Sequence, residues 1–156
     1  MSADNQQGRL DEDWIVGFTD GEGCFHVAIN KISGMSLGYQ VLPEFRIVQH
    51  EKDEKVLFQL QEYFGFGLIR VNRKDKNGIR KEFRVRGLEN LEKLSKFFRK
   101  NPLKTSKKEN FELFAEALEL MKRKEHLTEK GLHKIATIAS KMNRQVKSSF
   151  LRRKEV

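Results

Sequence analysis

The chain has 156 residues, of which 38% are hydrophobic, so it is long enough for one domain with a buried core. Its single cysteine, Cys24, excludes an internal disulfide and a multi-cysteine zinc site, and indicates an intracellular, reducing compartment. The net charge of +9 favours a polyanionic partner such as nucleic acid, although a basic protein without such a partner is equally compatible with it. No apolar run approaches the roughly 18 residues of a membrane span, so no membrane is expected as partner.

Three segments are predicted along the chain. Residues 1–10 are mostly polar and predict a flexible arm. Residues 11–143 contain no low-complexity linker and predict a single domain. Residues 144–156 are rich in Lys and Arg and predict a basic C-terminal tail.

The pattern of apolar residues predicts the elements of the domain in chain order. Helical spacing occurs at 11–21, 52–64, 88–100, 107–122 and 128–142, and alternation at 24–31, 39–49, 68–73 and 80–86. The residues expected to face the core from the strands are Phe25, Val27, Ile29, Phe45, Ile47, Ile69, Val71, Phe83 and Val85. The resulting order, αββαββα with further C-terminal helices, predicts an α+β fold with an antiparallel sheet.

The second predicted hairpin carries an excess of positive charge. From Arg70 to Arg86 it holds eight basic residues and two acidic ones, Asp75 and Glu82. Alternation directs these charges to one face of the sheet, which favours a platform for a DNA groove. A solvated strand face with a charged turn is the alternative.

The stretch WIVGFTDGEG at 14–23 is unusual for a helix end. Gly17 lies inside the helix, where glycine costs about 1 kcal/mol relative to alanine and usually permits close approach of another backbone. Asp20 and Glu22 lie at the C-terminal end, where the helix dipole disfavours carboxylates. A bound cation would reverse that penalty; a helix cap with two solvated acids would also account for the pattern.

This stretch resembles the LAGLIDADG motif, aligned over 15–23. The element order over roughly 11–125 agrees with that of the LAGLIDADG homing endonucleases, and 102–108 resembles their lysine-bearing segment. The resemblance implies a site-specific, metal-dependent DNA endonuclease whose sheet forms a DNA-binding saddle. Because the chain has one motif, it implies the homodimeric type, in which the motif helices pair. The residues implied at that dimer interface are Trp14, Val16, Gly17 and Asp20.

The resemblance also implies a metal site. Glu22 matches the metal-binding catalytic acid of the family, and the carbonyl of Gly21 is expected as the second ligand. Hard oxygen ligands and a phosphate substrate favour Mg²⁺, with another divalent ion such as Mn²⁺ as an alternative.

Three further positions match residues that surround the metals in the family. Gln49 matches a glutamine, and Lys107 is the first choice for a lysine, with Lys104 second. The position of a common family arginine falls near Asp53, so no basic partner is assigned there.

The outward strand positions are the predicted DNA-binding residues, because their mixed chemistry suits base edges. They are His26, Ala28, Asn30, Gln40, Glu44, Arg46, Arg70, Asn72, Glu82, Arg84 and Arg86. A strand of about nine residues matches about nine base pairs in length, so a dimer would cover a long, nearly palindromic site.

Two alternatives share this surface: an RNA maturase that assists splicing of the intron encoding it, and a DNA-binding repressor without cleavage activity. The sequence leaves the location open between bacterial or archaeal cytoplasm and an organelle, either chloroplast or mitochondrion.

Overall fold

The computed structural model describes residues 8–142 and 148–152. Its elements are α2 (Glu12–Glu22), β1 (Gly23–Lys31), β2 (Tyr39–His50), the 3-10 helix η1 (Glu51–Asp53), α3 (Glu54–Phe64), β3 (Leu68–Asp75), β4 (Gly78–Val85), α4 (Leu88–Lys100), α5 (Lys107–Lys122), the 3-10 helix η2 (Glu125–Leu127), α6 (Glu129–Met142) and α7 (Ser149–Arg152). The predicted αββαββα order with extra C-terminal helices is confirmed. Within these residues, none of the helices has both the length and the apolar composition needed to cross a membrane.

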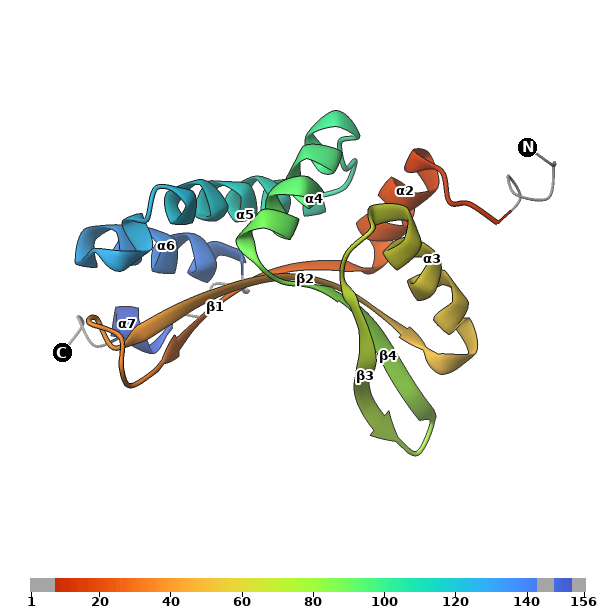
Figure 1. Cartoon of the computed structure of the whole chain (residues 1–156), viewed down its shortest axis with the longest axis horizontal. Helices are drawn as coiled ribbons and strands as arrows, with labels where there is room; N and C mark the ends of the chain where they lie inside the picture. Colours follow the sequence, from red (N-terminus) through yellow and green to blue (C-terminus); the bar gives the residue numbers. More distant parts are fainter. Residues whose placement is uncertain (1–7, 143–147, 153–156) are drawn as a thin grey trace.

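The four strands form one antiparallel sheet in the order β1-β2-β4-β3. Figure 1 shows the sheet as an arch, with α2 to α6 above it and the β3–β4 hairpin projecting below. We call the side of the sheet turned away from these helices the open face. The arrangement is the saddle expected from the sequence, with its concave side free of the large helices (Figure 1).

Aromatic side chains connect the sheet to the helices that cover it. Phe25 and Phe45 are buried from adjacent strands, and their ring centroids lie 5.0 Å apart. The ring of Phe98 from α4 lies 5.7 Å from Phe25, and that of Phe114 from α5 lies 5.3 Å from Phe25. Because side chains alternate along each strand, the sheet has a buried side that faces the helices and an opposite side, the open face.

One residue of the β3–β4 hairpin that was expected in the core is exposed, so that prediction is wrong. Val71 is 42% exposed. It belongs to β3, which is an edge strand and projects beyond the helices in Figure 1. Alternation alone directed Val71 inward, but no helix covers that part of the sheet.

The predicted arm and tail both include residues that pack on the domain. At the N-terminal end, Gln59 on α3 donates a hydrogen bond to the Gly8 carbonyl (2.7 Å); residues 1–7 lie outside the described residues. At the C-terminal end, α7 buries Phe150, whose ring lies 5.1 Å from that of Tyr39. Phe150 therefore belongs to the core although it lies in the stretch predicted as a basic tail, whereas Arg152 in the same helix is exposed. Residues 143–147 and 153–156 lie outside the described part.

Candidate metal and DNA-binding site

The motif helix α2 begins with a side-chain cap and ends directly in a strand. The N–H of Trp14 donates to Oδ1 of Asp11 (2.7 Å), which satisfies a free donor of the first turn. At the other end the N–H of Gly23 donates to the Thr19 carbonyl. A Cβ at Gly23 would lie 2.7 Å from Thr19 Cγ2 and 2.8 Å from Thr19 O, so glycine is required there. The sequence pattern of the motif contains this glycine, but only the structure gives its reason.

Asp20 holds the start of α5 against the end of α2. Its carboxylate accepts hydrogen bonds from the Lys104 N–H (2.9 Å), the Thr105 N–H (3.1 Å) and Thr105 Oγ1 (2.7 Å). Partial burial raises the pKa of Asp20, but these hydrogen bonds and the nearby Lys107 outweigh it and hold the pKa below its usual value. The carboxylate is therefore engaged within its own chain, and its place in a dimer interface stays a prediction.

Lys107 lies at the junction of α2 and β1. Its ammonium donates a hydrogen bond to the Gly23 carbonyl, and its backbone N–H donates to Thr105 Oγ1 (3.2 Å). The side chain of Lys104 is exposed instead, and only its backbone reaches Asp20. Of the two lysines considered from the sequence, Lys107 is the one that the fold brings to the end of the motif helix.

The strand register places Gln49 near the same junction. Ile47 on β2 pairs with Gly23, and Gln49 lies two residues further along β2. Gln49 is half-buried. Asp53, where the family carries an arginine, is exposed and precedes the first residue of α3.

The groups at this end of α2 suit a hard divalent cation. Glu22 and Gly21 are exposed. The last backbone carbonyls of a helix generally lack intrahelical partners and can serve as metal ligands. Within the described ranges, no three His, Cys, Asp or Glu side chains of the one chain come together as a metal site. At this end of α2, one chain therefore supplies oxygen ligands of the kind that a hard cation prefers.

The open face begins beside Lys107. A cavity of about 380 Å³ is lined by Cys24, His26, Arg46 and Lys107, among others. Cross-strand pairing continues from it in a row of Cys24, Arg46, Arg84 and Leu68 across all four strands. The lysine at the motif helix and the predicted base-facing side chains thus share one continuous surface.

Leu68 is a residue of this surface that sequence reasoning missed. It is 61% exposed and pairs with Arg84, which places it on the open face. Alternation carried back one residue from Ile69 would have found it. An exposed apolar side chain at this place suits contact with a thymine methyl group.

Two of the predicted base-facing residues are covered. Glu44 and Glu82 lie on the open face, but their side chains are only 8% and 6% exposed. Both oxygens of each carboxylate face donors of the same chain. Both carboxylates are therefore engaged within the chain rather than open to accept a hydrogen bond from a base.

The outer face of α2 has space for a neighbour. Trp14 is 41% exposed and stacks on Phe18, with ring centroids 4.7 Å apart. Gly17 and Gly21 are exposed, and a Cβ at either would meet nothing within 4 Å. Val16 is only 4% exposed, so its side chain belongs to the core of its own chain and its predicted place in a dimer interface is corrected.

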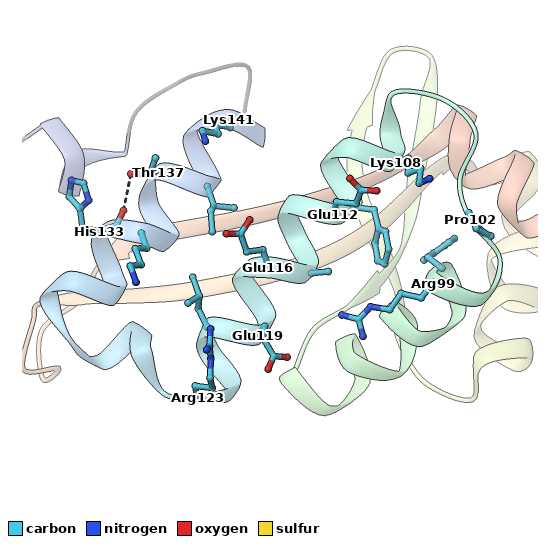
Figure 2. Close-up of a pocket in the computed structure, with 16 residues that line it drawn as sticks. Arg99, Pro102, Lys108, Glu112, Glu116, Glu119, Arg123, His133, Thr137 and Lys141 are labelled. Atoms are coloured by element: carbon cyan, nitrogen blue, oxygen red, sulfur yellow. Dashed lines mark hydrogen bonds between the residues drawn. The ribbon is translucent and has the colours of Figure 1, made fainter.

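A larger cavity lies elsewhere. It measures about 930 Å³ and is lined from α4, α5 and α6 by residues that include Arg99, Glu116, Arg123 and Lys141. Figure 2 shows these helices in front of the strands, so the cavity opens on the helix layer. It does not include any of the residues predicted for the metal or DNA site.

Comparison with known proteins agrees with this geometry. The sequence model described as LAGLIDADG endonuclease matches residues 15–118. The chain belongs to the LAGLIDADG endonuclease family. A Neurospora crassa protein named "Probable intron-encoded endonuclease 3" is 34% identical over 132 residues, which cover 83% of this chain and 24% of that protein.

Solved LAGLIDADG structures share the fold. The homing endonuclease I-TnaI is 48% identical with a TM-score of 0.86, and the match covers 94% of this chain and 97% of that one. I-SmaMI, bound to uncleaved DNA in the presence of calcium ions, is 34% identical with a TM-score of 0.85; the match covers 93% of this chain and 49% of that one. The chain spans 24% to 32% of the length of the first three curated relatives that it matches. LAGLIDADG endonucleases depend on divalent metal ions.

Proposed function

We propose that two copies of this chain form a homing endonuclease that makes Mg²⁺-dependent double-strand breaks in a long, nearly palindromic DNA site. The observation that carries the proposal is the position of Lys107. Its ammonium contacts the Gly23 carbonyl beside Glu22, in a cavity that is continuous with the open face of the sheet. A DNA backbone lying on that face would meet the lysine and the exposed carboxylate together.

The pairing of two chains is supported by the outer face of α2. Gly17 destabilises the helix by about 1 kcal/mol relative to alanine, and among the described residues nothing lies close enough to require a glycine there. A second α2 packed against Gly17 and Gly21 would require it. I-TnaI matches this chain over nearly its whole length, whereas I-SmaMI is about twice as long. Two copies of a single-motif chain would supply the two halves that the longer protein has in one chain.

The chemistry follows from groups that each chain contributes to the centre of such a dimer. Glu22 and the Gly21 carbonyl would hold Mg²⁺, which supplies activated water and neutralises charge on the phosphate. Lys107, fixed by its carbonyl contact, would stabilise the negative charge that develops on the scissile phosphate. Gln49 would orient water from the end of β2. With one Glu22 per chain, both strands would be cut by equivalent sites.

DNA is proposed as the partner on the open face. Arg, Asn, Gln and His side chains project from this face, and I-CpaMI and I-SmaMI were solved bound to DNA. Antiparallel strands in a saddle fit the curvature of a major groove. A β1–β2 ribbon of about nine residues per strand reaches across about nine base pairs.

We also propose that the chain is encoded in an intron and acts in an organelle. Relatives from Neurospora crassa and Schizosaccharomyces pombe are named as intron-encoded endonucleases, and one from Podospora anserina as a protein in ND4 intron 1. All three organisms are eukaryotes, which favours the organelle among the locations left open by the sequence.

The test is cleavage of a randomised-site plasmid library by the purified protein, with Mg²⁺ and with chelator. The wild type should cut one nearly palindromic site only with the metal, and Glu22→Gln should cut none. Glu89→Gln, at a side chain 86% exposed on α4, removes the same charge away from the site and should cut like the wild type. Selective binding without cleavage under any divalent ion would instead favour the repressor, or the maturase if the preferred ligand is RNA.

A further inference from the structure

Glu44 and Glu82 are acidic residues in the middle of a surface proposed to bind DNA. Glu44 accepts from Arg46 Nη1 through Oε1 (3.4 Å) and from Arg86 Nε through Oε2 (2.8 Å). Glu82 faces Arg70 Nε through Oε1 (3.3 Å) and accepts from the Asn72 amide through Oε2 (3.3 Å). Each carboxylate thus joins two donors.

The arginines above these carboxylates form one cluster. We define the arginine cluster as Arg46, Arg70, Arg84 and Arg86. Arg46 and Arg84 are direct cross-strand neighbours, and Arg84 and Arg86 are two positions apart on one face. Burial lowers the pKa of Arg84, and the nearby charges of Arg86 and Arg70 lower it further. Without nearby carboxylates, mutual repulsion would spread these side chains apart.

We propose that Glu44 and Glu82 are positioning residues that hold the arginine cluster in a fixed arrangement for reading guanines in a short run of base pairs. The inference rests on the proposed DNA-binding function. It assigns the two acids a role in specificity, although neither would touch a base.

The contacts of the cluster favour guanine. The carboxylates contact the Nε groups of Arg70 and Arg86, so the terminal amino groups of these two guanidinium groups remain available to donate hydrogen bonds. Two parallel donors match the O6 and N7 acceptors that only guanine presents together in the major groove. Residues two apart on a strand are separated by about 6.6 Å, which is about two base pairs of DNA. The cluster therefore spans about three to four adjacent base pairs in each half-site.

A positioning role and a direct DNA contact predict opposite effects of substitution on the affinity for DNA. Glu44→Gln or Glu82→Gln removes a negative charge from the surface, so the attraction to phosphate should be unchanged or stronger. The guanidinium groups would lose their fixed orientation, so the discrimination between guanine and other bases should fall. A residue with a merely structural role would change both affinities together.

The test is selection of bound duplexes from a randomised DNA library by the full chain, with calcium in place of magnesium. Wild type, Glu44→Gln, Glu82→Gln and the control Glu89→Gln are compared, each first checked by thermal unfolding. The two test variants should lose about tenfold or more of the preference for guanine at three or four adjacent positions per half-site. Their affinity for random duplex should not fall. If one of these variants fails to fold, Arg86→Lys is tested in its place. It keeps the positive charge but lacks the paired donors of the guanidinium, so it should lose the preference for guanine at the base pair that Arg86 contacts.

The outcomes separate this inference from the proposed function. A wild type that selects no DNA site refutes the proposed function itself. If the wild type selects a site but both Glu→Gln variants keep guanine discrimination within twofold, the positioning role is refuted and the proposed function stands.

Discussion

The carboxylate of Asp20 on the motif helix binds Thr105 twice, through the backbone N–H (3.1 Å) and through Oγ1 (2.7 Å). Thr105 Oγ1 in turn accepts the N–H of Lys107 (3.2 Å). These bonds fix the first turn of α5, and with it the lysine whose ammonium contacts the Gly23 carbonyl. The first acid of the motif therefore acts on the proposed site through the segment that it anchors.

Asp20→Asn is expected to weaken both the fold and the site. An amide has one acceptor oxygen and no charge, so hydrogen bonds to Lys104 or Thr105 are lost, at a cost of about 1–2 kcal/mol in unfolding free energy. The displaced Lys107 should also slow DNA cleavage. Urea unfolding and cleavage rates measure the two effects. Asp13→Asn, at an exposed position near the start of the same helix, should change stability by under about 0.5 kcal/mol; equal loss in both variants would contradict the anchoring role.

The stabilisation by Asp20 is expected to depend on pH in one direction. The folded state lowers the pKa of this carboxyl, so its contribution is complete above the unfolded pKa of about 3.9 and is lost as pH falls through the folded pKa. The difference in unfolding free energy between wild type and Asp20→Asn should therefore shrink from pH 6 toward pH 2.5. Urea titrations at four pH values measure it. A difference that stays constant over this range would show that the charge of Asp20 does not bind the α5 segment.

Lys107→Met is expected to separate cleavage from binding. The substitution keeps an apolar stem but removes the ammonium that lies on the Gly23 carbonyl. Cleavage should fall by about 100-fold or more, as for loss of a group that stabilises developing charge. Affinity for the uncleaved site in calcium should change by less than tenfold. Lys104→Met is the matched control, because its side chain is exposed and its backbone bond to Asp20 is kept. Equal loss in the two variants would contradict the choice of Lys107.

The sequence predicted the position of the motif and the strand faces but not the state of the side chains on them. Alternation correctly placed Glu44 and Glu82 on the open face. Glu44 is covered by Arg46 of its own strand and by Arg86, which follows β4. The pairing of Glu82 with Arg70 depends on the register of β3 and β4. Register is set by the whole sheet, so a single-strand pattern does not contain it.

The same limit applies to the ends of the fold. Phe150 lies in a basic stretch without apolar periodicity, and its burial depends on contact with Tyr39, which is distant in sequence. The family resemblance implies that Val16 contacts a second chain, whereas Ile15 and Val16 both face the core of this chain. Helical periodicity at the motif is ambiguous, because one face packs on the domain and the other is left exposed.

Gly17→Leu is expected to abolish pairing while leaving the chain folded. A Cβ at Gly17 meets nothing within 4 Å, so the chain itself has room for a larger side chain. A closely packed second α2 would not, and the variant should sediment as a monomer where the wild type is a dimer. Glu62→Leu, at a position that is also exposed but lies on α3, should remain a dimer. A dimeric Gly17→Leu would place the pairing surface elsewhere.

Phe150→Ala is expected to destabilise the protein although it lies in a stretch that is basic by composition. The side chain is fully buried, with its ring 5.1 Å from Tyr39 and 6.4 Å from His133. Loss of a buried phenylalanine costs about 3–5 kcal/mol in unfolding free energy. Leu127→Ala, at a side chain that is 47% exposed, should cost under about 1 kcal/mol. Because Tyr39 begins β2, a small effect of Phe150→Ala would mean that α7 does not support the outer end of the sheet in solution.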